Sequence, residues 1–181
     1  MTSTLPAACL TNIESAGVFC IDAATGNVML GLIKEGELKW DWIGGKYENE
    51  DIKVLESPNC DRTKYTDLEL VVRQTLAREM WEEVNMETAN FISKYANNYI
   101  SIYNGNTKKY VYVFTALIED VATLDELANR PRIGSPHMGY HWLSRAQLTA
   151  AIATGTHNEF KLRGFLKILF ANPDVRKLLG V

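Results

Sequence analysis

Residues 78–86 read Arg-Glu-Met-Trp-Glu-Glu-Val-Asn-Met, a stretch that contains three glutamates. An α-helix turns ~100° per residue, so Glu79, Glu82 and Glu83 fall within an arc of ~100° on one helical face. Glu79 and Glu83 also form an i, i+4 pair of like charges, which destabilises a helix by about 0.2–0.5 kcal/mol. A bound cation would explain this arrangement, whereas the simpler interpretation is a solvated acidic face. Arg78 lies four residues before Glu82 and is placed to hold a carboxylate by a forked ion pair.

The helix that carries these acids has recognisable ends. Thr66 and Glu69 have the spacing of a capping box, which predicts a helix start at this point. Asn85 stands where the helix should stop, because asparagine tolerates the left-handed conformation that follows many helices. The apolar residues at helical spacing predict a buried stripe opposite the acids. They are Ala77, Met80, Trp81 and Val84.

The rest of the chain alternates between strand and helix patterns. Strands are predicted near residues 18–21, 28–33, 38–43, 99–103, 110–118 and 141–143. Asn104-Gly105-Asn106 predicts a hairpin, and Ser144 with Gln147 predicts a second capping box. Further helices are expected near 124–128, 144–152 and 159–170. Residues 51–65 are polar and predict an inserted surface loop. The mixed order of strands and helices predicts one α/β domain spanning residues 1–181, with a mixed sheet sandwiched by helices.

Composition narrows the class of protein. The chain has 181 residues and a formal net charge of -3, and no basic run predicts the coating of nucleic acid by bulk charge. No apolar run approaches the roughly 20 residues that cross a bilayer, and the first ten residues lack the pattern of a signal peptide. The three cysteines and three histidines are widely spaced, without zinc-site spacing. We therefore expect a cytoplasmic protein with reduced thiols, whose metal, if any, is a hard cation held by oxygen.

The residues around this helix resemble a known family. Residues 78–86 are similar to the REUxEExGU core of the Nudix hydrolases, in which U is a bulky aliphatic residue. Residues 40–48, Trp-Asp-Trp-Ile-Gly-Gly-Lys-Tyr-Glu, resemble the family's approach to that core, with Ile43 in place of proline. The order of elements agrees as well, so the resemblance spans nearly the whole chain and implies a Nudix-like fold.

The family spacing is broken between the two parts of the motif. About a dozen extra residues separate Gly45 from the acidic helix. Counting forward from Gly45 puts the first acid of the family motif at Asp51, whereas counting back from Arg78 puts it at Leu70. Glu69 is already explained by the capping box, so the sequence assigns that acid to no position.

The resemblance implies an enzyme that hydrolyses a pyrophosphate bond with Mg²⁺ or Mn²⁺. It implies that Glu79, Glu82 and Glu83 bind the metal, with the backbone of Gly45 as a further ligand and Arg78 orienting a glutamate. The general base stays open between one of the helix glutamates and the pair Glu119 and Asp120. Aromatic residues of the predicted strands are candidates for stacking on a base. They are Trp40, Trp42, Tyr99, Tyr103, Tyr110, Tyr112 and Phe114, and Lys46, Lys108 and Lys109 are candidates for phosphate contacts.

The implied substrate is a nucleoside diphosphate linked to another group. ADP-ribose, a dinucleoside polyphosphate, a nucleoside triphosphate and an RNA cap all fit this description. Two alternatives remain: a diphosphoinositol polyphosphate hydrolase, suggested by residues 108–113, and a catalytically silent nucleotide-binding module on the same fold. The resemblance is compatible with a homodimer, and nothing in the sequence predicts a membrane partner.

Overall fold

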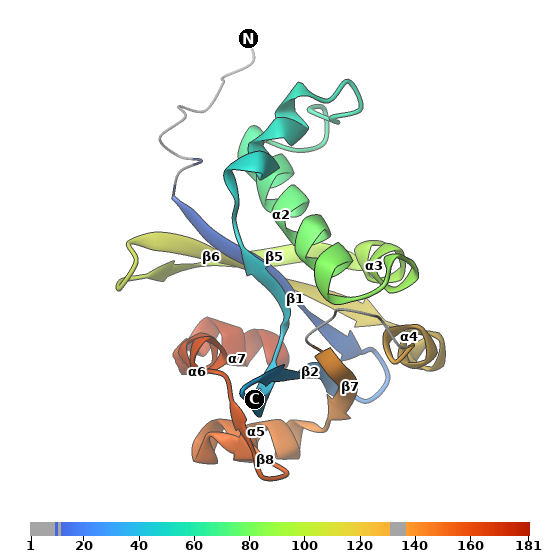
Figure 1. Ribbon diagram of the computed structural model, residues 1–181, viewed down its shortest axis with the longest axis vertical. Coiled ribbons are helices and arrows are strands. Elements are labelled where there is room, and N and C mark those ends of the chain that lie inside the picture. The colour runs from blue at the N-terminus through green and yellow to red at the C-terminus, as the bar shows by residue number, and fades with distance from the viewer. Residues whose placement is uncertain (1–9, 11, 131–136) are drawn as a thin grey trace.

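One mixed β-sheet runs through the middle of the molecule (Figure 1). The computed structural model describes residues 10, 12–130 and 137–181, with the backbone alone at residues 35 and 137. Within these residues nine strands form the sheet, in the order β5-β6-β1-β2-β3-β9-β8, while β4 pairs with β1 and β7 pairs with β2. The parallel pairs are β1 with β6 and β3 with β9, and the other pairs are antiparallel.

The elements follow one another along the chain as a mixture of strands and helices. The strands are β1 (Ile13–Asp22), β2 (Val28–Glu35), β3 (Glu37–Asp41), β4 (Ile43–Lys46), β5 (Ala96–Asn104), β6 (Lys109–Ile118), β7 (His137–Leu143), β8 (Thr156–His157) and β9 (Phe160–Leu162). The helices are the 3-10 helix η1 (Asn49–Glu56) and the α-helices α2 (Asp67–Glu83), α3 (Met86–Ser93), α4 (Val121–Ala128), α5 (Arg145–Thr154), α6 (Gly164–Ala171) and α7 (Pro173–Leu179).

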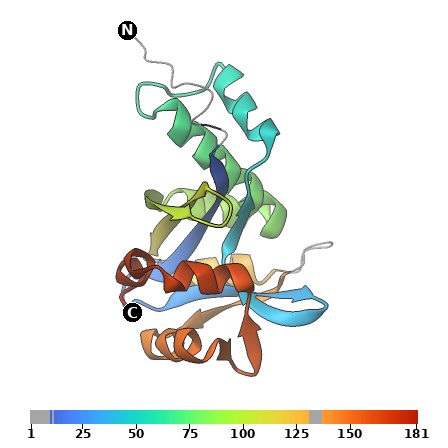
Figure 2. The same cartoon turned by 90° about the vertical axis from the view of Figure 1, so that its left-hand side faces the viewer.

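Helices cover both faces of the sheet, which confirms the predicted α/β class. Helices α2, α3 and α4 contribute apolar side chains to one core, among them Met80, Ile92 and Leu124. Helices α5, α6 and α7 bury Leu148, Phe170 and their neighbours in a second core on the opposite face. In Figure 2 the green helix α2 lies above the strands and the orange helix α5 lies below them. Each sheet face is therefore sealed by its own set of helices.

The chain changes its pairing partner at Trp42. Strand β3 pairs with β2, whereas β4, one residue further on, pairs with the first half of β1 through the register Gly17↔Gly44. The Trp42 side chain is buried at this switch and lies over the backbone of Gly17, because a Cβ built on Gly17 would come within 2.7 Å of the indole ring. No described strand pairs with the other edge of β4. This open edge of β4 borders the candidate site.

Several expectations about helices need correction. Residues 51–65 are not uniformly irregular, because residues 49–56 form η1 and Asp51 is buried there. Asn85 does not adopt a left-handed conformation: its φ is -71°, and its side chain caps α3, a helix that the sequence did not predict. The predicted helix 159–170 is the short strand β9 followed by α6. The capping boxes at Thr66 and Ser144 are both present, as predicted.

The predicted buried stripe on α2 is correct for two of its four residues. Met80 and Val84 are buried, but Ala77 is exposed and Trp81 is 56% exposed. The buried face is instead rotated toward the acids, and Glu79 lies within it. The reason is that β4 contributes glycines rather than large side chains, so polar groups of α2 approach the sheet closely.

We expect Gly17→Ala to destabilise the protein by about 1–3 kcal/mol, because overpacking a tight contact forces backbone or ring displacement. The added Cβ would lie 2.7 Å from both the Ile43 carbonyl oxygen and the Trp42 ring. Urea denaturation would measure the loss. Gly105→Ala is the matched control, since its Cβ would meet nothing within 4 Å, and it should shift stability by less than about 0.5 kcal/mol.

Candidate functional site

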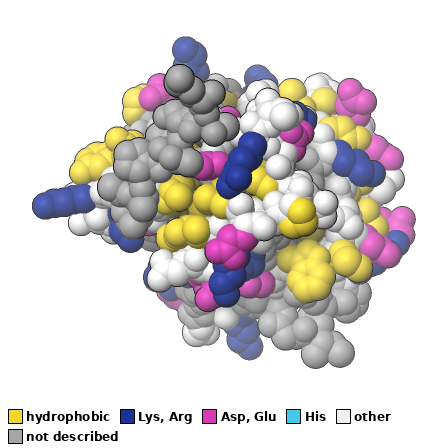
Figure 3. Space-filling view, turned by 90° about the horizontal axis from the view of Figure 1, so that it is seen from above, with side chains coloured by type: hydrophobic (Ala, Val, Ile, Leu, Met, Phe, Trp, Pro, Cys, Tyr) yellow, Lys and Arg dark blue, Asp and Glu magenta, His cyan; other side chains and the backbone are white. Residues whose placement is uncertain are grey.

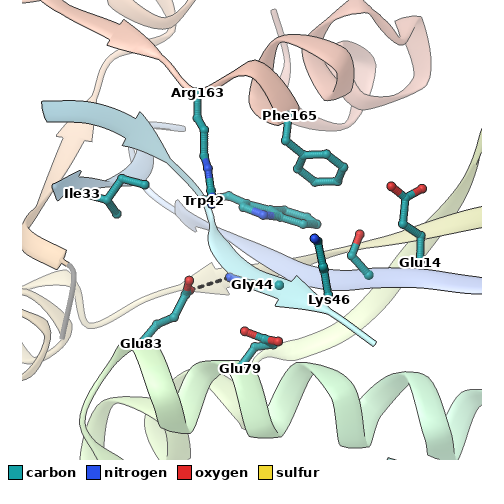
Figure 4. A pocket seen from close by; sticks show the side chains of 11 residues that line it. Glu14, Ile33, Trp42, Gly44, Lys46, Glu79, Glu83, Arg163 and Phe165 are labelled. Atoms are coloured by element: carbon teal, nitrogen blue, oxygen red, sulfur yellow. Dashed lines mark hydrogen bonds between the residues drawn. The ribbon is translucent and has the colours of Figure 1, made fainter. Parts of the chain in front are cut away.

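A cavity of about 420 Å³ lies along the open edge of β4 (Figure 4). Acidic side chains reach it from α2, and aromatic side chains reach it from the β3–β4 junction and from α6. The lining residues are Glu14, Ser15, Ile33, Trp42, Gly44, Gly45, Lys46, Glu79, Glu83, Arg163 and Phe165. The cavity therefore has an acidic side and an aromatic side, separated by the glycines of β4.

Two glycines let the acids of α2 reach the sheet. A Cβ on Gly45 would fall 2.2 Å from Oε2 of Glu79, so only glycine leaves room for that carboxylate. Gly44 has a φ of +153°, and its Cβ would collide with the backbone of Gly17. The amide N–H of Gly44 donates to Oε2 of Glu83 over 2.7 Å. The Gly-Gly pair is thus the surface against which Glu79 and Glu83 are positioned.

Glu79 is a buried carboxyl group in an acidic neighbourhood. Its pKa is raised to about 7, chiefly by burial and also by Glu83 and Glu82, while the Arg78 guanidinium opposes the rise. A carboxyl group held this way favours its neutral form unless more positive charge is brought near. Glu79 and Glu83 together therefore form a place where a cation would be stabilised.

Glu82 does not share the cavity with the other two glutamates. Its side chain is 56% exposed, and Nη1 of Arg78 lies 3.3 Å from both of its carboxylate oxygens. The same Nη1 donates to Oε1 of Glu79 over 2.9 Å. Arg78 thus contacts two of the glutamates as the sequence suggested, but the cavity itself contains Glu79 and Glu83 alone of the three.

Asp51 is a member of the site network that the sequence left unassigned. Its carboxylate is 1% exposed and accepts hydrogen bonds from Nε of Arg78 over 2.9 Å and from Nη2 over 3.2 Å. Thr75 Oγ1 and the Glu48 amide also donate to it, over 2.9 and 3.0 Å. The count forward from Gly45 therefore reaches the acid that binds Arg78, and the extra residues follow Asp51. Leu70, reached by the backward count, is buried apolar core.

Arg78 joins three segments at this point. Besides Asp51, its Nη2 donates to the backbone carbonyl of Lys46 over 2.6 Å. Burial alone would lower the pKa of Arg78, but Asp51 and Glu79 raise it above its ordinary value. The guanidinium is therefore a permanent positive charge that fixes η1, β4 and α2 relative to one another.

The aromatic side of the cavity comes from segments far apart in the sequence. The rings of Trp42 and Phe165 lie 5.7 Å apart at 49°. Arg163 reaches the same side, and its Nη1 donates to the buried Asp41 carboxylate over 2.6 Å. Burial outweighs the opposing effect of Arg163 and leaves the pKa of Asp41 raised to about 6. Arg163, Phe165, Glu14, Ser15 and Ile33 were not predicted as site residues, and no local pattern marks them.

Most other candidates from the sequence lie away from this cavity. Among the proposed stacking residues only Trp42 lines it, and among the lysines only Lys46 does. Trp40, Tyr112 and Phe114 are buried in the cores, and Tyr99 packs on Tyr112 and Phe114. Tyr103 packs on Tyr110 at the hairpin. Asp120 caps α4 by binding Thr123, and Glu119 is exposed, so neither lines the cavity.

The donor set fits a hard divalent cation that needs few protein ligands. Within the described residues no three His, Cys, Asp or Glu side chains converge as a metal cluster. Mg²⁺, however, is commonly held by one or two carboxylates and keeps several waters for its substrate. Glu79 and Glu83 beside the Gly44-Gly45 backbone match that requirement. Glu82 and the Gly45 backbone as further ligands stay predictions.

Comparisons with known proteins give a likeness of fold. No family model matches the chain, and no curated protein matches it. Among solved structures, it is similar to the *E. coli* dihydroneopterin triphosphate pyrophosphohydrolase, with 13% identity, a TM-score of 0.45 and coverage of 91% of this chain and 93% of the other. A *C. elegans* Ap4A hydrolase gives 14% identity, a TM-score of 0.45 and coverage of 93% and 100%.

A NUDIX hydrolase from *Nitrosomonas europaea* gives 11% identity, a TM-score of 0.44 and coverage of 92% and 88%. The similarity to these structures is one of overall fold. No helix in the described part of the chain has the length and apolar character to cross a membrane.

We expect Asp51→Ala to destabilise the protein by about 3–5 kcal/mol, because it leaves the half-buried Arg78 charge without its main partner. Chemical denaturation would measure this loss. Glu50→Ala changes the neighbouring acid, whose ion pair with Lys53 is exposed, and should cost less than about 1 kcal/mol. Equal effects of the two substitutions would show that the Asp51–Arg78 pair does not anchor the site.

Proposed function

We propose that this protein is a Nudix-type hydrolase that uses Mg²⁺ or Mn²⁺ to cleave a pyrophosphate bond. The observation that carries the proposal is the placement of Glu79 and Glu83 against the Gly44-Gly45 backbone, inside a cavity large enough for a small molecule. The substrate class is a nucleoside diphosphate linked to another group, such as ADP-ribose, a dinucleoside polyphosphate, a nucleoside triphosphate or an RNA cap.

The metal would be held by Glu79 and Glu83, with Glu82 and the Gly45 backbone as further candidate ligands. Bound there, a divalent cation neutralises phosphate charge and lowers the pKa of a coordinated water. The protein's own contribution is to hold the two carboxylates in position. Arg78 fixes Glu79 over 2.9 Å, and the Gly44 amide fixes Glu83 over 2.7 Å, so the carboxylates need little reorganisation when a cation arrives.

Lys46 is the residue best placed to meet a phosphate. Its backbone is held by Arg78, its side chain lines the cavity, and it forms no ion pair with any described residue. Figure 4 shows its side chain between Trp42 and Glu79. A mobile ammonium at this point can contact phosphate oxygens as a point charge.

The local charge argues against a substrate with many phosphates on one ring, such as a diphosphoinositol polyphosphate. Lys46 and Arg163 are the cations that line the cavity, and the acids Glu14, Glu79 and Glu83 face them. Arg163 is already paired with Asp41. Basic and acidic side chains are also interspersed over the face seen in Figure 3, without a basic patch that would attract such a polyanion.

We expect Glu83→Gln to lower kcat for the best substrate by on the order of 100-fold or more, because the metal would lose a charged ligand. The measurement is hydrolysis of ADP-ribose, diadenosine polyphosphates, nucleoside triphosphates, capped RNA and a diphosphoinositol phosphate with Mg²⁺, Mn²⁺ or EDTA. Metal-dependent cleavage of one class would name the substrate.

The matched control is Glu87→Gln, which changes an exposed glutamate on α3 that pairs with Arg130 and lies outside the cavity. It should leave turnover unchanged. Glu119→Gln tests whether Glu119, the remaining candidate outside α2, is the general base of the reaction. If no substrate were cleaved and nucleotides bound equally to wild type and Glu83→Gln, the silent binding module would replace the enzyme.

Metal binding should also appear without any substrate. We expect Mg²⁺ or Mn²⁺ at a concentration 100 times its Kd to stabilise the folded protein by about 2.7 kcal/mol, and EDTA to reverse this. Differential scanning calorimetry would measure the shift in Tm. The double variant Glu79→Gln/Glu83→Gln should lose the metal-dependent part. An equal metal-dependent shift in both proteins would place the cation elsewhere.

A further inference from the structure

The Ser15 side chain is a buried hydroxyl group in the wall of the cavity. Ser15 is 3% exposed, and its Oγ has no hydrogen-bond partner among the described residues. Buried hydroxyl groups are nearly always hydrogen-bonded, because burying one without a partner is unfavourable. An unpartnered group of this kind in a cavity wall leaves its hydrogen bond to be supplied by water or by a bound ligand.

The neighbours of Ser15 place it at the aromatic side of the cavity. Ser15 pairs directly with Lys46 in the antiparallel register of β1 and β4, so these side chains share one face of the sheet. Gly17 follows two residues later on that face, and the Trp42 indole lies over it. The hydroxyl is therefore next to the indole, between the phosphate-binding candidate Lys46 and the aromatic wall.

Apart from Lys46, the charged side chains on this side already have partners. Glu14 accepts hydrogen bonds from Asn104 Nδ2 over 3.2 Å and from Thr107 Oγ1 over 2.6 Å. Arg163 is held by Asp41 over 2.6 Å. Ser15 thus offers a donor and an acceptor that the surrounding residues do not use, beside two aromatic rings that provide flat apolar surface.

We propose that Ser15 is a specificity-determining residue, whose hydroxyl hydrogen-bonds an uncharged heteroaromatic ring of the substrate lying against Trp42 and Phe165. This inference rests on the proposed function, because the ring belongs to the organic group of the phosphoanhydride. A flat ring with ring nitrogens or carbonyl groups matches both the aromatic wall and the single neutral hydroxyl. A site that hydrogen-bonds such a group discriminates against rings that lack a complementary atom.

The test compares binding of probes that differ only in the ring. Adenosine, guanosine, cytidine and uridine diphosphates, with inorganic pyrophosphate as the probe without a ring, would be titrated by calorimetry into wild type, Ser15→Ala and the control Ser101→Ala. Ser101 lies exposed on β5, outside the cavity. We expect Ser15→Ala to weaken binding of the tightest nucleotide about five- to tenfold and to leave pyrophosphate binding unchanged. The Ser101→Ala control should bind every probe as the wild type does.

A stability measurement separates this role from a structural one. If Ser15 only supported the fold, Ser15→Ala would lower Tm; a binding role predicts that Tm is unchanged or raised, because an unsatisfied buried hydroxyl is removed. Unchanged nucleotide affinities, an equal loss for pyrophosphate, or no preference among rings in wild type would each overturn the proposal. Ring-selective binding lost in Ser15→Ala would uphold it even if no substrate were hydrolysed, so its failure and that of the proposed function are distinguishable.

Discussion

The half-buried charge of Arg78 is the constraint on which the site depends. A guanidinium in this position needs acceptors on several sides, and it finds them in Asp51, the Lys46 carbonyl and Glu79. These groups belong to η1, β4 and α2, so satisfying one cation fixes three segments at once. Because leaving a half-buried charge unpaired is costly, the arrangement is held firmly rather than loosely. This arrangement around Arg78 sets the position of the α2 carboxylates.

The glycines of β4 supply the matching constraint on the sheet. Side chains on Gly44 or Gly45 would occupy the space of Gly17 or of the Glu79 carboxylate. Their absence brings a polar helix face against a strand edge, which explains why α2 buries Glu79 while Trp81 is exposed. One short strand thus separates an acidic surface suited to a cation from an aromatic surface suited to a ring, and both open into the same cavity. A phosphoanhydride, with charge at one end and an organic group at the other, matches that division.

Tertiary contacts revised the sequence interpretation at particular residues. The helix of α2, its capping box, the hairpin at Gly105 and the Gly-Gly approach follow from local patterns and were predicted. The role of Asp51 was not, because a long segment separates it from Arg78 and spacing alone left two counts open. The stripe through Trp81 was wrong for a related reason: periodicity identifies an apolar face but not what the sheet presents to it.

The sequence by itself determined which local elements form and predicted which carboxylates would hold a cation, since capping, glycine turns and carboxylate spacing act over a few residues. Only the tertiary structure decided that Glu79 and Glu83 enter the cavity while Glu82 remains with Arg78. It also decided that Ser15, Phe165 and Arg163 form the opposite wall, through contacts such as Arg163–Asp41 across 122 residues of chain. Such contacts depend on how strands pair and how helices cover the sheet, and strand pairing between distant segments leaves no signature at a fixed spacing in the sequence.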